Sequence, residues 1–404
     1  MNRVVVTGLG AVSPVGQSVK DYWSALVAGR SGLQPPQIER GETLTTKLVG
    51  QIRDFDAAAH FDSKQIGLLD RVSQFAVVAA REALAQSGLT LTDELSENVA
   101  AIIGSGSGGQ GTMDDGFHRL YAEGATRLHP LSIPRMMMSA AASQVSLHCN
   151  LKGPSYAVAS ACASATHAIG QAFHLVRSGT VTAALCGGTE SSISFGAMKG
   201  WEAMRIMAPD ACRPFSRDRK GMVIAEGAAV LVLENLDHAR KRGADILAEV
   251  IGFGMSADAK DLTAPDPNGM ARAITMAMKD ASLAPGDVDY VNAHGTGTVA
   301  NDESETQALH KSFGDAARKL AISSTKSVVG HSLGAAGALE LVAVVMAMRD
   351  AVVPPTINYL GPDPACDLDY VPNEARSMPV NAALSNSFAF GGLNAVLAAR
   401  SFKG

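Results

Sequence analysis

The chain has 404 residues, of which 47% are apolar and 18% charged, and its formal net charge is −5. This composition is typical of a globular protein with a large core and excludes a disordered chain. A nucleic-acid-binding protein would carry a basic excess, so we expect no nucleic-acid partner.

The cysteines are odd in number, widely spaced and without a CxxC pair; they are Cys149, Cys162, Cys186, Cys212 and Cys366. This pattern disfavours a disulfide framework or a zinc site and favours a reducing, cytoplasmic setting. The N-terminal sequence MNRVVVTGLGAVSPVG lacks the long apolar region of a signal peptide. The most apolar expected helix, at 333–348, contains Glu340 and is too short to cross a bilayer, so we expect no membrane span.

A buried strand is expected at 4–7, followed by a turn and then by a helix at 19–28. The GLG at 8–10 resembles half of a dinucleotide-binding fingerprint. Its third glycine is misplaced, and no acidic residue follows a second strand at the required distance. NAD binding is therefore disfavoured.

A strong amphipathic helix is expected at 71–87, where Gly88 stops it, and a strand follows at 99–103. The small-residue run GSGSGGQG at 104–111 could cradle a phosphate, but it lacks the Lys-Ser/Thr ending of a P-loop. We favour a turn packed closely against another backbone. A helix at 136–147, a strand before Cys162, and strands at 182–187 and 227–234 complete this half.

From residue 246 the pattern begins again. Strands are expected at 246–254, 289–293 and 321–323, helices at 270–282, 303–312 and 333–348, and two closing strands around the turn AFGG at 389–392. The sequence therefore predicts an α/β fold in two halves of similar plan, 1–245 and 246–404.

Cys162 lies where a strand of small residues is expected to turn into a helix that ends at Gly179. A helix start offers unpaired N–H groups and the positive end of the helix dipole, and both stabilise a thiolate. The alternative is that Cys162 is a small buried apolar residue. This stretch alone leaves both interpretations open.

Three further stretches place reactive side chains at strand ends or helix starts. His294 lies in VNAHGTGT, Lys326 and His331 lie in SSTKSVVGHSLGAAG, and LSNSFAFGGLN forms a polar and aromatic turn. A cysteine thiolate attacks carbonyl carbon, and two imidazoles can serve a second step that generates a carbanion. Hydrolysis would need neither two imidazoles nor a lysine. A Schiff base on Lys326 is disfavoured because the cysteine already supplies covalent catalysis.

The motifs ASACASATHAIG, VNAHGTGT, SSTKSVVGHSLGAAGALE and NSFAFGG resemble the signature motifs of the β-ketoacyl-acyl carrier protein synthases, the condensing enzymes of fatty-acid and polyketide synthesis. The likeness extends over essentially the whole chain. A Cys–His–His set with a lysine is similar to that of the elongating synthases of the second type, and differs from the sets of the initiating type and the thiolases. The resemblance implies a thiolase-like, five-layered α-β-α-β-α fold and a homodimer.

The resemblance also implies a role for each reactive residue. Cys162 would accept an acyl chain from the phosphopantetheine of an acyl carrier protein, and the N–H groups of Cys162 and Phe390 would form the oxyanion hole. His294 and His331 would promote decarboxylation of malonyl-carrier protein and stabilise the enolate. Lys326 would give electrostatic support near His331, with further support from Glu340, Thr296 and Thr298. The family needs no metal, and no cofactor beyond the phosphopantetheine that arrives on the carrier protein.

The acyl pocket and its gate are implied at Ser107, Trp201, Phe390, Gly391 and Gly392. Ser107 stands where the family usually has a bulky aliphatic residue, which predicts a deeper pocket that admits longer or unusual chains. Ala389 replaces a glycine of the closing turn and should stiffen a loop that must open. Trp201 replaces a phenylalanine near the pantetheine entrance.

Several basic residues that usually dock the acidic carrier protein are missing after Lys64, which leaves Lys64, Arg127 and Arg205 as candidates. These features, with the phrase SNSFAFGGLNAVL, resemble the specialised synthases of rhizobial nodulation-factor acyl chains. An alternative is a non-catalytic partner subunit of the chain-length-factor kind, which shares the fold. Such partners lack the nucleophile, so Cys162 and the two histidines disfavour this alternative.

Overall fold

The computed structural model describes residues 1–403, and its main sheet has the strand order β3-β2-β4-β5-β1-β6-β12-β11-β7-β8. The strands of the first half are β1 (Val4–Val12), β2 (Val99–Gly104), β3 (Ser155–Val158), β4 (Ala183–Glu190) and β5 (Gly227–Asn235). Those of the second half are β6 (Ala248–Ala257), β7 (Tyr290–Asn292), β8 (Ala321–Ser323), β11 (Ala382–Ala389) and β12 (Leu393–Arg400). The two short strands β9 (Val352–Val353) and β10 (Arg376–Ser377) pair with each other.

The sheet repeats one plan on either side of a narrow joint. Outward from the joint, the order is β1-β5-β4-β2-β3 on one side and β6-β12-β11-β7-β8 on the other. On both sides the first two pairings are antiparallel and the outer two are parallel. The joint itself is the short antiparallel pairing of Val4–Val6 with residues 248–250. The α/β fold with two similar halves is confirmed, and the boundary at 245/246 stays a prediction.

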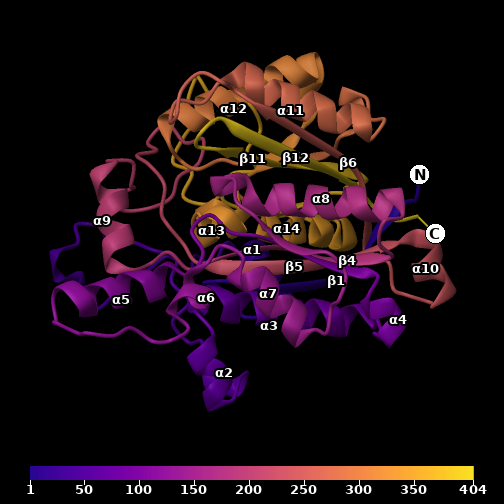
Figure 1. Ribbon diagram of the computed structural model, residues 1–404. Helices are drawn as coiled ribbons and strands as arrows, with labels where there is room; N and C mark the ends of the chain where they lie inside the picture. Colours follow the sequence, from indigo (N-terminus) through magenta and orange to yellow (C-terminus); the bar gives the residue numbers. More distant parts are fainter. Residues whose placement is uncertain (404) are drawn as a thin grey trace.

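Helices and half-sheets alternate in five layers (Figure 1). Helices α3 (Arg71–Ser87) and α7 (Ala140–His148) cover the outer face of the first half-sheet, and α11 (Pro267–Asp280) with α12 (Val299–Phe313) covers that of the second. Between the half-sheets lie α8 (Ser164–Ser178) and α14 (Ala336–Asp350). The remaining helices are α1 (Val19–Val27), α2 (Ser63–Leu68), α4 (Asp93–Ser96), α5 (Gln110–Tyr121), α6 (Ser132–Met136), α9 (Phe195–Ala203), α10 (Leu236–Lys241) and α13 (Lys326–Val329).

The central helix α14 is buried on every side. All its residues from Ala336 to Met348 are buried, and a helix that lies between two sheets must be apolar all round. It packs closely on α8, because a Cβ on Gly337 would lie only 1.9 Å from Thr166 Oγ1. This contact fixes the distance between the two halves close to the start of α8, where Cys162 lies.

The first strand is longer than the sequence predicts, because it continues through the GLG motif to Val12. A Cβ on Gly8 or Gly10 would lie 2.1 or 1.9 Å from the carbonyl oxygen of Ala83 or Ala79 in α3. The two glycines therefore let a helix pack directly against the strand. The motif serves packing and forms no nucleotide-binding turn.

Two expected helices differ from the structure. The helix expected at 136–147 begins only at Ala140, as α7, because Met137 has an extended ψ of 145°, and α6, which ends at Met136, is not predicted. The helix expected at 333–348 begins as a single 3-10 turn, Leu333–Ala335, and becomes α14 at Ala336. Helices α5 and α9 are not predicted by the sequence pattern, and glycines at 111, 116, 196 and 200 interrupt their apolar periodicity. Over residues 1–403, no helix combines the length and apolarity that a membrane crossing requires.

Candidate active site

Cys162 lies in a strained turn that joins β3 to α8. The turn is a single 3-10 helix, Ala161–Ala163, and Ala161 has a left-handed backbone with φ of 49°. The Ser164 hydroxyl holds this turn, because it donates to the carbonyl of Ala161 at 2.7 Å and accepts from the N–H of Ser160 at 2.9 Å. Cys162 is therefore held one turn before α8, close to the helix start that the sequence predicts.

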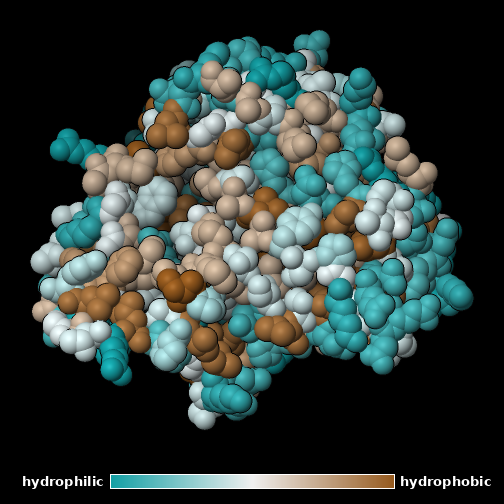
Figure 2. All heavy atoms as spheres, viewed as in Figure 1, coloured by the Kyte–Doolittle hydropathy of each residue, from teal (hydrophilic) through white to brown (hydrophobic). Residues whose placement is uncertain are grey.

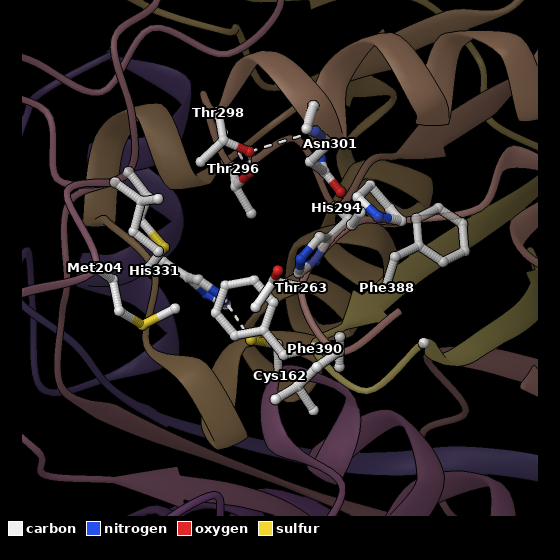
Figure 3. Close-up of a pocket in the computed structure, with 18 residues that line it drawn as sticks. Cys162, Met204, Thr263, His294, Thr296, Thr298, Asn301, His331, Phe388 and Phe390 are labelled. Carbon is white, nitrogen blue, oxygen red and sulfur yellow. Dashed lines mark hydrogen bonds between the residues drawn. The ribbon is translucent and has the colours of Figure 1, made fainter. Parts of the chain in front are cut away.

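The structure brings Cys162 together with His294 and His331 from the other half of the chain (Figure 3). The distance from His331 Nε2 to Cys162 Sγ is 3.0 Å. The two imidazole rings lie edge to face with centroids 5.3 Å apart. One donor atom from each of the three residues lies within 4.8 Å of the others, and all three side chains are buried.

Lys326 contacts His294, and its charge, after burial, also lowers the pKa of His331, near which the resemblance placed it. Its Nζ donates to the His294 carbonyl at 2.6 Å and lies 3.4 Å from His294 Nδ1. Gly330, with φ of 81°, ends α13 and redirects the chain before His331. The backbone of His331 forms a parallel β-bridge with that of Ile224. The Lys326 ammonium also forms a buried ion pair with Glu340.

Burial is the largest influence on the pKa values of Cys162, His294 and His331. It raises the pKa of the Cys162 thiol to about 12, although the Lys326 charge and the N–H groups of Cys162 and Phe390 act to lower it. The low-pKa thiolate expected at a helix start is therefore not what the structure gives. Burial, followed by the Lys326 charge, holds the pKa of His294 and of His331 well below the ordinary histidine value. Both imidazoles are neutral at neutral pH, and each keeps one N–H to donate.

The turn that carries His294 is held by Glu305, a residue that the sequence analysis missed. The Glu305 carboxylate accepts from the N–H groups of His294 at 2.9 Å and Gly295 at 2.8 Å. Glu305 projects from α12, which begins at Val299 with Thr298 as its N-cap, four residues earlier than expected. The hydroxyls of Thr296 and Thr298 lie 2.9 Å apart. The only sequence signal for Glu305 is an acidic residue soon after the HGTGT motif.

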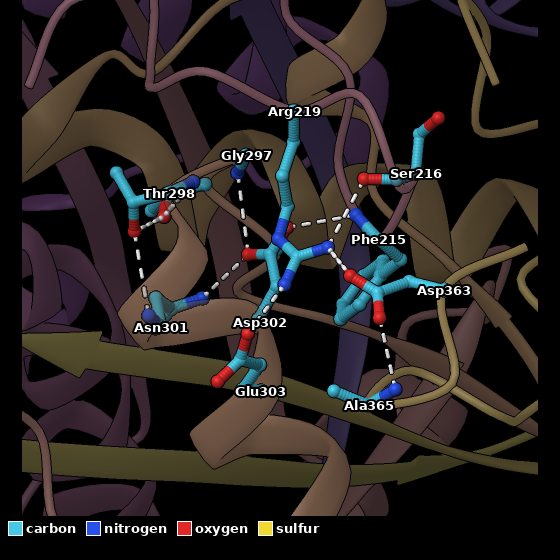
Figure 4. Close-up of polar contacts among 12 residues, drawn as sticks. Phe215, Ser216, Arg219, Gly297, Thr298, Asn301, Asp302, Glu303, Asp363 and Ala365 are labelled. Carbon is cyan, nitrogen blue, oxygen red and sulfur yellow. Dashed lines mark hydrogen bonds and ion pairs between the residues drawn. The ribbon is translucent and has the colours of Figure 1, made fainter. Parts of the chain in front are cut away.

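A second missed network lies behind this turn and is centred on the buried guanidinium of Arg219 (Figure 4). Arg219 pairs with Asp363 and with Glu303, the latter at 3.1 Å, and lies 3.8 Å from Asp302. Asp302 accepts from the N–H of Phe215 at 2.7 Å, and burial raises the pKa of its carboxyl to about 7. The network ties the start of α12 to the segment RPFSRDRKG that precedes β5.

Two cavities meet at Cys162. The first, of about 400 Å³, holds His294, His331, Thr296 and Thr298. The second, of about 470 Å³, lies on the other side and is lined by Ser107, Trp201 and Leu333 among others. Cys162, Met204 and Phe390 line both, and the Phe390 ring stacks against Trp201 at a centroid distance of 6.5 Å.

The closing turn lies between the two cavities. Gly391 and Gly392, with φ of 81° and 67°, connect β11 to β12, whereas Ala389 is the last residue of β11 and lies outside the turn. The N–H of Gly391 donates to the carbonyl of Leu262 at 2.7 Å. The N–H of Asp258 donates to the carbonyl of Gly392 at 2.9 Å. The turn is therefore tied to the segment 258–262.

The three candidate docking residues are exposed, and each lies on a different segment of the fold. Arg205 follows α9 and adjoins Met204, which lines both cavities. Lys64 lies on α2, which projects from the lower edge of the molecule in Figure 1. Arg127 lies in the connection between α5 and α6.

Comparison with known proteins gives full-length matches. The family model "Beta-ketoacyl synthase, N-terminal domain" matches residues 1–239, and "Beta-ketoacyl synthase, C-terminal domain" matches residues 247–360. The chain is 46% identical to Nodulation protein E of Rhizobium sp. (strain N33), over 98% of this chain and 99% of that protein. It is 45% identical to 3-oxoacyl-[acyl-carrier-protein] synthase 2 of Coxiella burnetii (strain RSA 493 / Nine Mile phase I), over 98% and 97%.

Among solved structures, the ishigamide ketosynthase/chain length factor superposes with a TM-score of 0.95 at 36% identity and covers 100% of both chains. Both the sequence and the backbone of this chain therefore match those of these known proteins over nearly the entire length.

Proposed function

The chain belongs to the β-ketoacyl synthase family, and from this membership we propose that it is a condensing acyltransferase that makes 3-oxoacyl-carrier protein. Its substrates are an acyl thioester and malonyl-carrier protein, in fatty-acid synthesis or in a specialised acyl-chain pathway. The position of Cys162 at the junction of two cavities carries the proposal. One cavity suits an acyl chain and the other brings two histidines to a second substrate.

In the first half-reaction, Cys162 Sγ attacks the carbonyl carbon of the acyl thioester. Because the thiol is protonated, its proton must leave during the attack, and it passes to the departing phosphopantetheine sulfur. The His331 Nε2–H, 3.0 Å from Sγ, donates to the cysteine sulfur. The N–H groups of Cys162 and Phe390 stabilise the oxyanion. Collapse of the tetrahedral intermediate breaks the old C–S bond, and the departing phosphopantetheine thiolate recovers the proton. The acyl chain then occupies the cavity lined by Ser107 and Trp201.

In the second half-reaction, malonyl-carrier protein enters the cavity that holds His294 and His331. The bond to its carboxylate breaks, CO₂ leaves, and the electron pair forms an enolate whose oxygen accepts hydrogen bonds from the two neutral imidazoles. The enolate carbon attacks the carbonyl of the acyl-Cys162 thioester. Collapse of this second intermediate breaks the bond to Sγ and returns the cysteine as a thiolate, which takes up a proton from solvent water.

Burial and the charge of Lys326 together keep both imidazoles neutral, and Lys326 is itself held by Glu340. We propose that the Cys–His–His cluster works without a metal, although its donor atoms lie close enough together for one. The Lys326 ammonium contacts His294 directly, and its charge repels a divalent cation at that position. The phosphopantetheine of the acyl carrier protein supplies the thiol that carries the acyl and malonyl groups.

We propose a homodimer that works in the reducing cytoplasm. Its interface is supported by apolar side chains that gather at the lower left of Figure 2, over α5 and the segment leading to α7. They include Phe117, Tyr121, Ile133 and Met137. Strand β3 is an edge of the main sheet beside them, and Tyr156 on it is also exposed. The reducing setting is supported by the free thiols of all five cysteines, which are buried.

A non-catalytic, chain-length-factor-like subunit is the alternative, since one similar structure is titled as a ketosynthase/chain length factor. A subunit of that kind has no use for a buried thiol 3.0 Å from an imidazole, or for a second imidazole held neutral beside it. The complete catalytic set favours the active enzyme.

The test is incubation of the purified protein with acyl- and malonyl-carrier protein, with CO₂ and thioester products measured. The wild type is expected to release CO₂ and 3-oxoacyl product. Cys162→Ala should lose condensation, and His331→Ala should lose decarboxylation of malonyl-carrier protein. Cys186→Ala, which alters a buried cysteine in β4, is the control and should retain activity. Normal condensation by Cys162→Ala would contradict the assignment of the nucleophile.

A further inference from the structure

Glu190 is a fully buried carboxylate that no step above uses. It is the last residue of β4, and its exposed fraction is 0%. It accepts hydrogen bonds from the N–H groups of Gly106 at 2.7 Å and Gly334 at 3.0 Å. The hydroxyls of Ser107 and Ser192 donate to it as well.

These donors come from two segments that meet at the site. Gly106 and Ser107 form one wall of the second cavity, the one assigned to the acyl chain. Gly334 lies three residues after His331 and is preceded by Leu333, whose backbone is left-handed with φ of 46°. A Cβ on Gly334 would lie 2.3 Å from the Gly106 nitrogen, so the two turns touch.

A carboxylate suits this position because its two oxygens can accept from all four donors. An apolar side chain would leave the N–H groups of Gly106 and Gly334 buried and unpaired. Burial raises the pKa of Glu190, while each of its four hydrogen bonds opposes this effect by stabilising the charged form. The hydroxyl of Ser107 is therefore a ligand of this carboxylate and is not free to bind a substrate.

We propose that Glu190 is a positioning residue that fixes the turn carrying His331 to the wall of the acyl cavity and thereby holds His331 against Cys162. The inference rests on the proposed function for the identity of the cavity. It gives the structure a mechanical link between the acyl cavity and the imidazole that serves both half-reactions.

Glu190 also acts on Cys162 through its charge. The charged and titratable groups that face the thiol are Glu190, which raises its pKa, Lys326, which lowers it, and the imidazoles of His331 and His294, which are neutral. Removal of the Glu190 charge should therefore lower the pKa of the thiol. Exposure of the thiol by loosened packing would lower its pKa as well, so Glu190→Asp, which keeps the charge, separates the two effects.

The experiment compares Glu190→Gln, which removes the charge, with Glu190→Asp, which keeps the charge but shortens the side chain. Glu82→Gln is the matched control, because Glu82 also accepts from two backbone N–H groups, those of Ala11 and Val19, and lies outside both cavities. The readouts are the pH dependence of Cys162 alkylation by iodoacetamide, followed by mass spectrometry, and kcat and KM of condensation. Cys162→Ala gives the background from the other cysteines.

Glu190→Gln is expected to shift the alkylation midpoint down by about half a pH unit or more, and Glu190→Asp should leave it in place. Both should lower kcat about 10- to 100-fold with little change in KM, because the His331 contact loosens. Glu82→Gln should change neither readout. If Glu190→Asp keeps the kcat of the wild type, the positioning role is overturned. This outcome can be read even if Glu190→Gln fails to fold.

An alkylation shift in Glu82→Gln as large as that in Glu190→Gln also overturns the proposal. Alkylation needs no carrier protein, so the two proposals fail separately. A wild type that makes no 3-oxoacyl product, but shifts its alkylation midpoint on Glu190→Gln, contradicts only the proposed function.

Discussion

At the scale of single residues, burial and, after it, the charge of Lys326 set the protonation of the two imidazoles. Its ammonium lies against His294 and pairs with buried Glu340. Together with burial it lowers the pKa of the imidazoles of His294 and His331. Because both rings stay neutral, each can donate a hydrogen bond to the enolate without transferring a proton that would quench it.

The first prediction concerns the pH dependence of malonyl-carrier protein decarboxylation. In the wild type the rate should hold as the pH falls below about 6.5, the ordinary histidine value, because the imidazoles still resist protonation. In Lys326→Met/Glu340→Gln the pKa values of His294 and His331 rise, so the acidic limb of the profile should move to higher pH. CO₂ release measured from pH 5 to 8 checks this.

The double variant is needed because Lys326→Met alone leaves the Glu340 carboxylate buried without its partner, at a cost of about 3–5 kcal/mol. Glu340→Gln alone is the second control, since it keeps the lysine charge and should not move the limb to higher pH. An unchanged profile in the double variant would rule out Lys326 as the source of the lowered pKa values.

At the scale of elements, the contact between α8 and α14 holds the two halves in register. Thr166 of α8 lies against the backbone of Gly337, and its hydroxyl contacts the Ser387 hydroxyl of β11 at 2.7 Å. One central contact therefore joins the helix that follows Cys162 to the helix that follows His331.

Gly337→Ala is accordingly predicted to destabilise the protein by about 1–3 kcal/mol, since the new methyl group overlaps Thr166 Oγ1. Urea unfolding measures the effect. The control is Gly286→Ala, because nothing lies within 4 Å of a Cβ at Gly286. Thr166→Ala combined with Gly337→Ala should recover part of the loss, and a purely additive double variant would argue against the contact.

Some helices and strands can be predicted from neighbouring residues, whereas others depend on contacts with distant parts of the chain. The helix at 71–87 is predicted to the residue, because its periodicity is long and Asp70 and Gly88 cap its ends. The break between α6 and α7 is missed, because no glycine or proline follows Met136, and its one signal in the sequence is Ser139, the N-cap of α7. The extended course of β1 through Gly8 and Gly10 depends on the approach of α3, which lies about 70 residues away in the sequence.

At the scale of the whole molecule, the net charge is −5, so docking of the proposed acidic carrier protein would depend on local basic residues. Of the three candidates, only Arg205 adjoins a residue that lines both cavities. Arg205→Glu is predicted to raise KM for malonyl-carrier protein about 5- to 10-fold with kcat unchanged.

The increase in KM should shrink as the ionic strength rises, because salt screens exposed charges. Lys241→Glu, on α10 at the opposite side of the molecule in Figure 1, is the control and should leave KM unchanged. An equal increase from Lys64→Glu would extend the docking surface to α2, and no increase from Arg205→Glu would remove Arg205 from it.

The sequence by itself determined the repeated β/α plan and the reactive residues Cys162, His294 and His331. These signals are local, because apolar periodicity, glycine stops and the position of a residue at a strand end depend on neighbours a few residues away. The family motifs are likewise read from short continuous stretches.

Only the tertiary structure decided which groups act on one another. It placed Lys326 against His294, turned the helix-start thiol into one with a raised pKa, and brought Glu190 and Glu305 to the turns that carry the histidines. Burial and Coulomb interactions depend on distance in space, and these partners are 11 to 169 residues apart in the chain. No local pattern records such distances, so the chemistry of the site is set by how the two halves pack.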